Sequence, residues 1–297
     1  MASEVRIRPA LASDREAIAA FTEHTFDWGD YVAGAFDTWL DQPGTQLVVA
    51  VDDQDRAVAL SRGRLVSSSE AWFNAARVHP DWRGRGIAGD MAAVLRNWAA
   101  EEGALVGRLL VEDWNEAAIR HVEKIGFRQV VSVVRCTKPI GEASPNPNGN
   151  GGKRVPSRLR ARPAHAEDAI PAFASWSIGQ LGTAMRGLSG GHWTFAKLTV
   201  DHLVVAARSG AFWEIGGGWA VVDGEGPRLE ASWLETRPED APEMIRALID
   251  LAVGRGVESI DIWLPPLPWI VRDVRRLGFA LEPMAVYAVE LSPQAIP

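Results

Sequence analysis

The chain has 297 residues, 47% of them hydrophobic and 23% charged, which is enough for two hydrophobic cores of ordinary size. Its net charge of -7 argues against sequence-independent binding of nucleic acid, which requires a basic surface. The single cysteine, Cys136, excludes an intrachain disulfide and a thiolate metal site, and we expect no metal.

The first half of the sequence alternates between segments with strand and helix periodicity. Short polar turns between consecutive strands predict antiparallel neighbours, and the order as a whole predicts an α/β fold with a mixed sheet flanked by helices. The expected elements are a strand at Val5–Arg8, a helix from the capping box Ser13–Glu16 to about Phe26, a helix over Val32–Leu40, strands at Gln46–Val51, Ala57–Leu65 and Ala71–Val78, a helix at Ile87–Glu101, a strand at Arg108–Glu112, a helix at Asn115–Ile125 and a strand at Phe127–Thr137.

The second half repeats the first. Arg8-Pro9 and Arg162-Pro163 are 154 residues apart, and the two Gly-Phe pairs at Gly126 and Gly278 are 152 apart. Two matches at nearly the same offset predict a duplicated domain. The Gly-, Pro- and Asn-rich segment 141–156 cannot form a core and is expected to be a linker between domains at 1–140 and 157–297.

The stretch VHPDWRGRGIAGDM, at Val78–Met91, places two arginines and three glycines ahead of a predicted helix. Helix N-termini attract anions through unpaired N–H groups, and two guanidinium groups suit a diphosphate. A Walker loop is excluded because no Gly-Lys-Ser/Thr follows. Gly84, Gly86 and Gly89 also spell the dinucleotide fingerprint GxGxxG, so an NAD-dependent oxidoreductase is one alternative, although HPDWR separates the loop from its strand.

A third reading rests on Arg83, Gly86 and Ala88. They resemble the RxxGxG/A acyl-coenzyme A signature of the GCN5-related N-acetyltransferase (GNAT) family, in which the preceding strand ends in V-x-P, as Val78-His79-Pro80 does. The family's later N-x-x-A helix ending in G-F is similar to Asn115, Ala118, Gly126 and Phe127. The resemblance covers about Val5–Lys138 and implies two tandem GNAT-like domains, acetyl-CoA as cofactor and acetyl transfer to an amine.

The resemblance also implies cofactor-binding residues. Main-chain groups of Ala76, Arg77 and Val78 would meet the pantetheine and thioester, and Asn115 would contact the pantetheine arm, although a helix N-cap explains Asn115 equally well. The pyrophosphate would be bound by Arg83, Gly84, Arg85, Gly86, Ile87 and Ala88.

Acetyl transfer requires a neutral amine, and a carboxylate can remove its proton. We expect Glu112 or Glu70 to be that base. The position at which many GNAT enzymes carry a tyrosine acid is Val122, which leaves a non-catalytic acyl-CoA sensor as an alternative. The expected acceptor is a small-molecule amine, such as an amino acid or a natural-product amine, and its expected contacts are Trp28, Tyr31, Phe36, Trp72 and Trp114.

The second copy lacks these ligand groups. LETRPEDAPEMIRAL, from Leu234, carries acids where the first copy has its arginines, and Leu267 replaces Asn115. We expect a degenerate domain, in which Gly216–Gly218 forms a hairpin turn or bulge. Met1–Arg15 lacks the apolar segment of a signal peptide, and no apolar run nears the roughly 20 residues that cross a bilayer. We therefore expect a cytoplasmic protein with no membrane partner, either a monomer with pseudo-dimeric domains or a homodimer.

Overall fold

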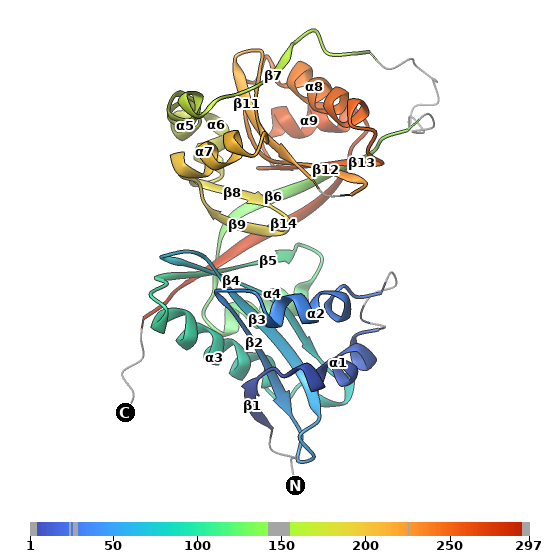
Figure 1. Cartoon of the computed structure of the whole chain (residues 1–297), viewed down its shortest axis with the longest axis vertical. Coiled ribbons are helices and arrows are strands. Elements are labelled where there is room, and N and C mark those ends of the chain that lie inside the picture. The colour runs from blue at the N-terminus through green and yellow to red at the C-terminus, as the bar shows by residue number, and fades with distance from the viewer. Residues whose placement is uncertain (1–4, 24, 26–28, 142–154, 225, 293–297) are drawn as a thin grey trace. The chain divides into compact units, whose positions relative to one another are not determined.

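A computed structural model describes residues 5–23, 25, 29–141, 155–224 and 226–292 (Figure 1). The chain divides into two compact units. Unit 1 contains Met1–Leu109, Ala117–Arg128 and Tyr287–Pro297, and unit 2 contains Leu110–Glu116 and Gln129–Val286. These units cut across the two halves of the sequence, so the division at 1–140 and 157–297 stays a prediction about the duplicated sequence. Most of the expected linker lies outside the described residues.

Unit 1 contains the predicted mixed sheet. Its strands lie in the order β1-β2-β3-β4-β5, and all neighbours are antiparallel except β4 and β5. The end of β14 (Ala280–Glu290) lies beside β5. The elements are β1 (Arg6–Pro9), α1 (Arg15–Thr22), α2 (Val32–Leu40), β2 (Thr45–Val51), β3 (Ala57–Ser67), β4 (Glu70–Val78), α3 (Ile87–Glu101), β5 (Val106–Glu112) and α4 (Glu116–Lys124), with β5 and α4 each crossing the division between the units.

Helices cover both faces of this sheet (Figure 1). Helices α1 and α2 bury Ile18 and Phe36 in a core that includes Leu60 of β3. On the opposite face α3 packs closely, since a Cβ added at Gly63 would lie 2.9 Å from the Trp98 ring. Helix α4 lies next to α3, where Arg96 donates to the carbonyl of Ile125 at 2.9 Å.

The start of α1 differs from the expected capping box at Ser13–Glu16. The chain enters the helix through a 3-10 turn at Ala12–Asp14, and no side-chain bond caps α1. Asp14 instead accepts the Leu11 backbone N–H at 2.8 Å and forms an ion pair with Arg8 at 2.7 Å. The ion pair with a neighbouring strand therefore determines this turn, which a local motif could not reveal.

Unit 2 repeats the plan of unit 1. Its strands lie in the order β6-β13-β12-β11-β10-β7, and β12 and β13 are the parallel pair. No helix among the described residues of either unit is long and apolar enough to cross a membrane. The elements are β6 (Arg128–Pro139), β7 (Ala161–Pro163), α5 (Ala169–Ile178), α6 (Gln180–Ala184), β8 (Leu188–Gly191), β9 (Thr194–Lys197), α7 (Val200–Arg208), β10 (Phe212–Ile215), β11 (Gly218–Asp223), β12 (Arg228–Glu235), α8 (Ala241–Gly254), β13 (Ser259–Leu264), α9 (Pro268–Arg276) and the first part of β14.

The predicted hairpin turn at Gly216–Gly218 is confirmed. Gly216 and Gly217 have φ of 59° and 87°, and they connect the antiparallel strands β10 and β11. Such a two-residue turn requires left-handed backbone at both positions, which glycine adopts at the least cost.

Strand β6 occurs where a strand was predicted, but all of it after Arg128 belongs to unit 2. It pairs with β13 from Val134 to Pro139. Arg135 and Thr137 of β6 both bond to the buried Asp261 of β13, each at 2.7 Å. These contacts join residues more than 120 positions apart in sequence, so the periodicity of the first half could not reveal them.

Candidate active site

The glycine-rich loop forms an exposed turn at the N-terminus of α3. After β4 the chain makes a 3-10 turn at Pro80–Trp82, and α3 then begins at Ile87. Gly84 and Gly86 have φ of 77° and 84°, a left-handed backbone that favours glycine. Residues 83–86 are all exposed, so solvent reaches the loop directly before the buried Ile87, the first residue of α3. The predicted anion site therefore faces solvent.

Both loop arginines are held in place and keep hydrogen-bond donors for a ligand. Arg83 Nε donates to the Val78 carbonyl at 3.2 Å, and an Arg85 terminal nitrogen donates to the Asp81 carbonyl at 3.1 Å. The Arg85 guanidinium also lies over the Trp82 ring, 4.6 Å from its centroid. A guanidinium has five N–H donors, so each arginine could still bind a phosphate.

Next to this loop, β4 offers main-chain groups to an extended ligand. The register between β4 and β5 runs over Glu70–Trp72, only the first part of the strand. A bulge follows, at which Ala75 has φ of 59°. From the bulge to Val78, β4 is no longer paired with β5. The main-chain groups on that edge could therefore bond to an extended amide chain such as pantetheine.

The sequence comparisons agree with this geometry. Residues 15–127 match the model of the Acetyltransferase (GNAT) family. The chain contains a GNAT domain. Proteins of this family are acetyltransferases that use acetyl-CoA, so the GNAT domain supports acyl transfer in general terms. No curated protein matches the sequence.

Solved structures show the same fold over the whole chain. A GCN5-related N-acetyltransferase from Sphaerobacter thermophilus is 14% identical, with a TM-score of 0.68 over 99% of this chain and 98% of that one. A tandem GNAT protein from the clavulanic acid biosynthesis pathway is 16% identical, with a TM-score of 0.56 over 98% and 100%. A fungal multi-domain GH3 β-N-acetylglucosaminidase contains a GCN5-related glucosamine N-acetyltransferase region that is 12% identical, with a TM-score of 0.67 over 97% of this chain and 38% of that one. The likeness to the tandem protein extends the GNAT fold to both halves of the sequence.

The surroundings of the loop disfavour the alternative of a dinucleotide fold. A dinucleotide loop turns directly out of the first strand of a parallel βαβ unit. Here β4 is antiparallel to β3, and the 3-10 turn at Pro80–Trp82 separates it from the glycines. The GxGxxG spacing in the GNAT domain therefore has a different structural context.

The two predicted bases have different surroundings. Glu70 is 6% exposed at the start of β4, the end away from the loop, and it forms an ion pair with Arg108 of β5. Glu112 is the last residue of β5 and half-buried, and within the described residues its carboxylate makes no hydrogen bond or ion pair. The ion pair explains the burial of Glu70 without a catalytic role, whereas the Glu112 carboxylate is available to a ligand.

Glu112, Trp114 and Asn115 lie together in Leu110–Glu116, a segment of unit 2. Trp114 is 64% exposed, and Asn115 lies directly before α4, where its backbone N–H donates to the Glu112 carbonyl at 2.9 Å. Val122, at the family's tyrosine position, is buried in the GNAT domain. A proton donor for the leaving thiolate is therefore absent at that position.

The expected acceptor contacts divide into exposed and buried residues. Tyr31 is 45% exposed, and its ring meets Trp39 edge-on with centroids 5.8 Å apart. Phe36 and Trp72 are almost completely buried, and Phe36 packs in the core with Ile18 and Leu60. Trp28 lies outside the described residues.

Two arginines of β3 were not predicted as site residues, and the first of them, Arg62, lies near Tyr31 and Trp39. Arg62 and Arg64 alternate along β3, on the face that carries the buried Leu60. Arg62 is 5% exposed, and Arg64 is half-buried. The signal was present, because residues two apart on a strand share a face and a buried strand rarely carries two cations.

In unit 2 the segment that corresponds to the glycine loop carries acidic side chains, and these pair with other groups of the same unit. Arg237 forms ion pairs with Asp240 at 2.6 Å and with Glu239 at 3.6 Å. In the first turn of α8, Glu243 accepts the Arg158 backbone N–H at 2.8 Å. These carboxylates would repel a diphosphate.

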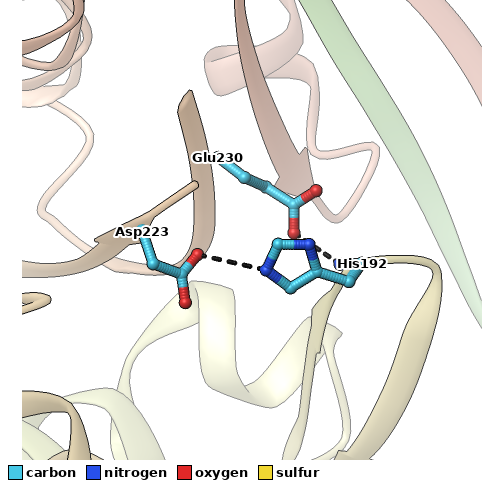
Figure 2. Close-up of side chains that lie close together, drawn as sticks. All are labelled: His192, Asp223 and Glu230. Atoms are coloured by element: carbon cyan, nitrogen blue, oxygen red, sulfur yellow. Dashed lines mark hydrogen bonds and ion pairs between the residues drawn. The ribbon is translucent and has the colours of Figure 1, made fainter. Parts of the chain in front are cut away.

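Unit 2 also contains a cluster of His192, Asp223 and Glu230, whose ligand atoms lie within 4.8 Å of one another and could hold a metal ion. His192 Nε2 lies 3.5 Å from Asp223 Oδ1, and the His192 backbone N–H donates to Glu230 Oε1 at 2.5 Å (Figure 2). His192 and Trp193 form the turn between β8 and β9, both with positive φ. The contacts therefore fasten this turn to β11 and β12, which explains the cluster without an ion.

Proposed function

We propose that the protein is an acetyl-CoA-dependent N-acetyltransferase whose acceptor is a small-molecule amine. The observation that carries the proposal is the exposed loop directly before α3, in which Arg83 and Arg85 lie beside the left-handed Gly84 and Gly86. A diphosphate fits there because both guanidinium groups keep donors beyond their main-chain bonds and because residues 83–86 are exposed. Gly84 and Gly86 have no side chain that would block its approach.

Each part of the cofactor has a counterpart in the chain. The Arg83–Ala88 segment would hold the pyrophosphate, and main-chain groups of Ala76–Val78 would bind the pantetheine arm. When bound, acetyl-CoA would supply a thioester whose acetyl carbon the amine nitrogen attacks, so that a C–N bond forms, the C–S bond breaks and coenzyme A leaves as a thiolate that takes its proton from water. Glu112 would take the amine proton directly or through water.

Thiol release from acetyl-CoA by the full-length protein, in the presence of a panel of amines, tests this function. Amine-dependent release supports an enzyme. Binding of coenzyme A without release for any amine would support the sensor, the alternative favoured by the buried Val122. The two outcomes separate catalysis from binding.

The loop assignment has its own test. Replacing Arg83 and Arg85 together by Gln should weaken coenzyme A binding by at least 100-fold in calorimetry, since each charge-assisted bond contributes about 1.5–3 kcal/mol. Arg56→Gln is the matched control, because Arg56 is a surface arginine paired with Asp52 in the β2–β3 turn. An unchanged affinity in the double variant would overturn the assignment.

A further inference from the structure

Arg62 is a buried cation without an anionic partner. Within the described residues its side-chain acceptor is the neutral amide oxygen of Gln42, 2.5 Å away, and its guanidinium lies 4.7 Å from the centroid of the Trp39 ring. Among the described residues no carboxylate forms an ion pair with it, and its Nε is buried without a hydrogen-bond partner. Burying a charge without an opposite charge beside it costs folding free energy, and a bound anionic ligand would remove that cost.

A second unsatisfied group lies directly across the sheet. The β3–β4 register places Arg62 opposite Asn74, whose side-chain oxygen is also buried without a partner in the described part of the chain. Unpaired buried acceptors are rare in native proteins. An unpaired donor and an unpaired acceptor on neighbouring strands therefore suit a ligand that carries both an anionic and an N–H group.

Arg64 adds a second positive charge on the same face. It lies two residues from Arg62 on β3 and opposite Trp72 of β4. Burial, and next the charge of Arg64, lower the pKa of Arg62 from its usual value to about 10. In contrast, the neighbouring Arg77 is balanced by Asp30 at 2.7 Å. The charge of Arg62, unlike that of Arg77, has no ion-pair partner in the described part of the chain.

This face adjoins the part of the GNAT domain at which acetyl transfer would occur. Asn74 directly precedes the bulge at Ala75, where the edge of β4 that would bind pantetheine begins. A ligand between Arg62 and Asn74 would thus present its nitrogen close to the thioester. Positive charge nearby also disfavours a protonated amine, so this environment favours the neutral nucleophile.

We propose that the acceptor is an amino acid, with its carboxylate bound by Arg62 and Arg64 and its α-amine directed by the side-chain oxygen of Asn74. The inference rests on the proposed N-acetyltransferase function and specifies its substrate class. A carboxylate suits a guanidinium because it can accept two parallel hydrogen bonds. The α-amine is also easier to deprotonate at neutral pH than a lysine side chain.

The test compares L-amino acids with their primary amides, which keep the amine and side chain and lose the negative charge. Because loss of the carboxylate also lowers the pKa of the amine, the two are compared at equal concentrations of neutral amine. Full-length protein should acetylate its best amino acid with a kcat/KM about 10- to 150-fold above that for the corresponding amide, the contribution of a charge-assisted bond. D-glucosamine serves as an unrelated amine without a carboxylate. Equal use of amino acids and uncharged amines would overturn the inference and leave the proposed function intact.

Three variants locate the effect. Arg62→Gln should remove most of the preference for the amino acid, because it should lower kcat/KM for the amino acid far more than for the amide, and coenzyme A affinity should stay the same. Asn74→Ala should lower kcat/KM for both acceptors, since both contain the amine. Arg56→Gln is the surface control and should change neither. Arg62→Gln with an undiminished preference would overturn the role of Arg62.

If no amine is acetylated, the proposed function is overturned. A second measurement then tests the carboxylate site by itself. The melting midpoint of the full chain is then measured with each amino acid and each amide. A rise with amino acids that Arg62→Gln abolishes supports the carboxylate site. No rise with any amino acid overturns it.

Discussion

Glu70, the first residue of β4, and Arg108 of β5 form an ion pair in which the side chains are only 8% and 12% exposed. The parallel register places Trp72 opposite Arg108, so Glu70 lies two positions earlier on the same face of the sheet. The pair therefore joins the two strands on which the site depends.

Breaking this pair should destabilise the protein. Glu70→Gln or Arg108→Gln alone should each lower the free energy of unfolding by about 3–5 kcal/mol, because the remaining charge stays buried. The double variant should be more stable than either single variant, as urea unfolding can show. Lost turnover with undiminished stability in Glu70→Gln would instead indicate that Glu70 is the catalytic base.

Removing the Glu112 carboxylate should slow acetyl transfer. We expect Glu112→Gln to lower kcat/KM by about 100- to 10,000-fold, the usual contribution of a general base, and to leave coenzyme A affinity unchanged. Glu101→Gln, at the exposed end of α3, is the matched control. Full activity of Glu112→Gln would assign the proton transfer to another group.

Two glycine variants should have opposite effects. Gly86→Ala should cost about 1–2 kcal/mol of stability and weaken coenzyme A binding, because Gly86 has φ of 84°. Gly34→Ala should add about 0.5–1 kcal/mol, since Gly34 lies inside α2 and a Cβ there would meet nothing within 4 Å. Thermal unfolding and calorimetry measure both effects. Equal behaviour of the two variants would contradict a left-handed loop.

The thiol of Cys136 should be inert in the folded protein. Burial raises its pKa to about 12, so the thiolate that reacts with thiol reagents is scarce at pH 8. Titration with a chromogenic disulfide should detect no protein thiol before denaturation and one thiol afterwards. Rapid labelling of the native protein would show that β6 opens readily.

The stability contributed by Glu235 should depend on pH. Burial raises the pKa of this carboxyl above its unfolded value, while Ser175 Oγ donates to it at 2.9 Å and opposes the rise. The folded state therefore binds the proton more tightly, and stability falls as pH rises through the unfolded and then the folded pKa. Glu235→Gln should be more stable than the parent chain at pH 7, with a smaller difference at pH 4. Parallel stability curves would contradict this.

Local patterns in the sequence predicted much of the fold. Helix α3 begins and ends at Ile87 and Glu101 as expected, and the Gly216–Gly217 turn follows from the backbone that only glycine adopts easily. The arginine-glycine loop was also predictable, because an anion site at a helix N-terminus requires residues that are close in sequence. These features depend on neighbours along the chain.

Other features were not accessible to such patterns. Glu70 was expected to be a base because carboxylates near a central strand can act so, yet its surroundings depend on Arg108, 38 positions away. Phe36 was expected to contact substrate because it belongs to an aromatic segment, and it is core because α1 and α2 close over it. The alternation of Arg62 and Arg64 within a predicted strand is visible in the sequence, but the burial of Arg62 is visible only in the structure.

The sequence by itself determined the duplicated order of helices and strands, the glycine loop with its two arginines and the loss of those ligand groups in the second copy. All of these depend on the spacing of residue types along a short stretch of chain. Tertiary structure alone decided that β6 pairs with β13, that Glu70 binds Arg108 and that Arg62 faces Asn74. Those relationships arise only when strands that are distant in sequence pair with each other. The pairing brings their side chains onto one face of the sheet and removes them from water.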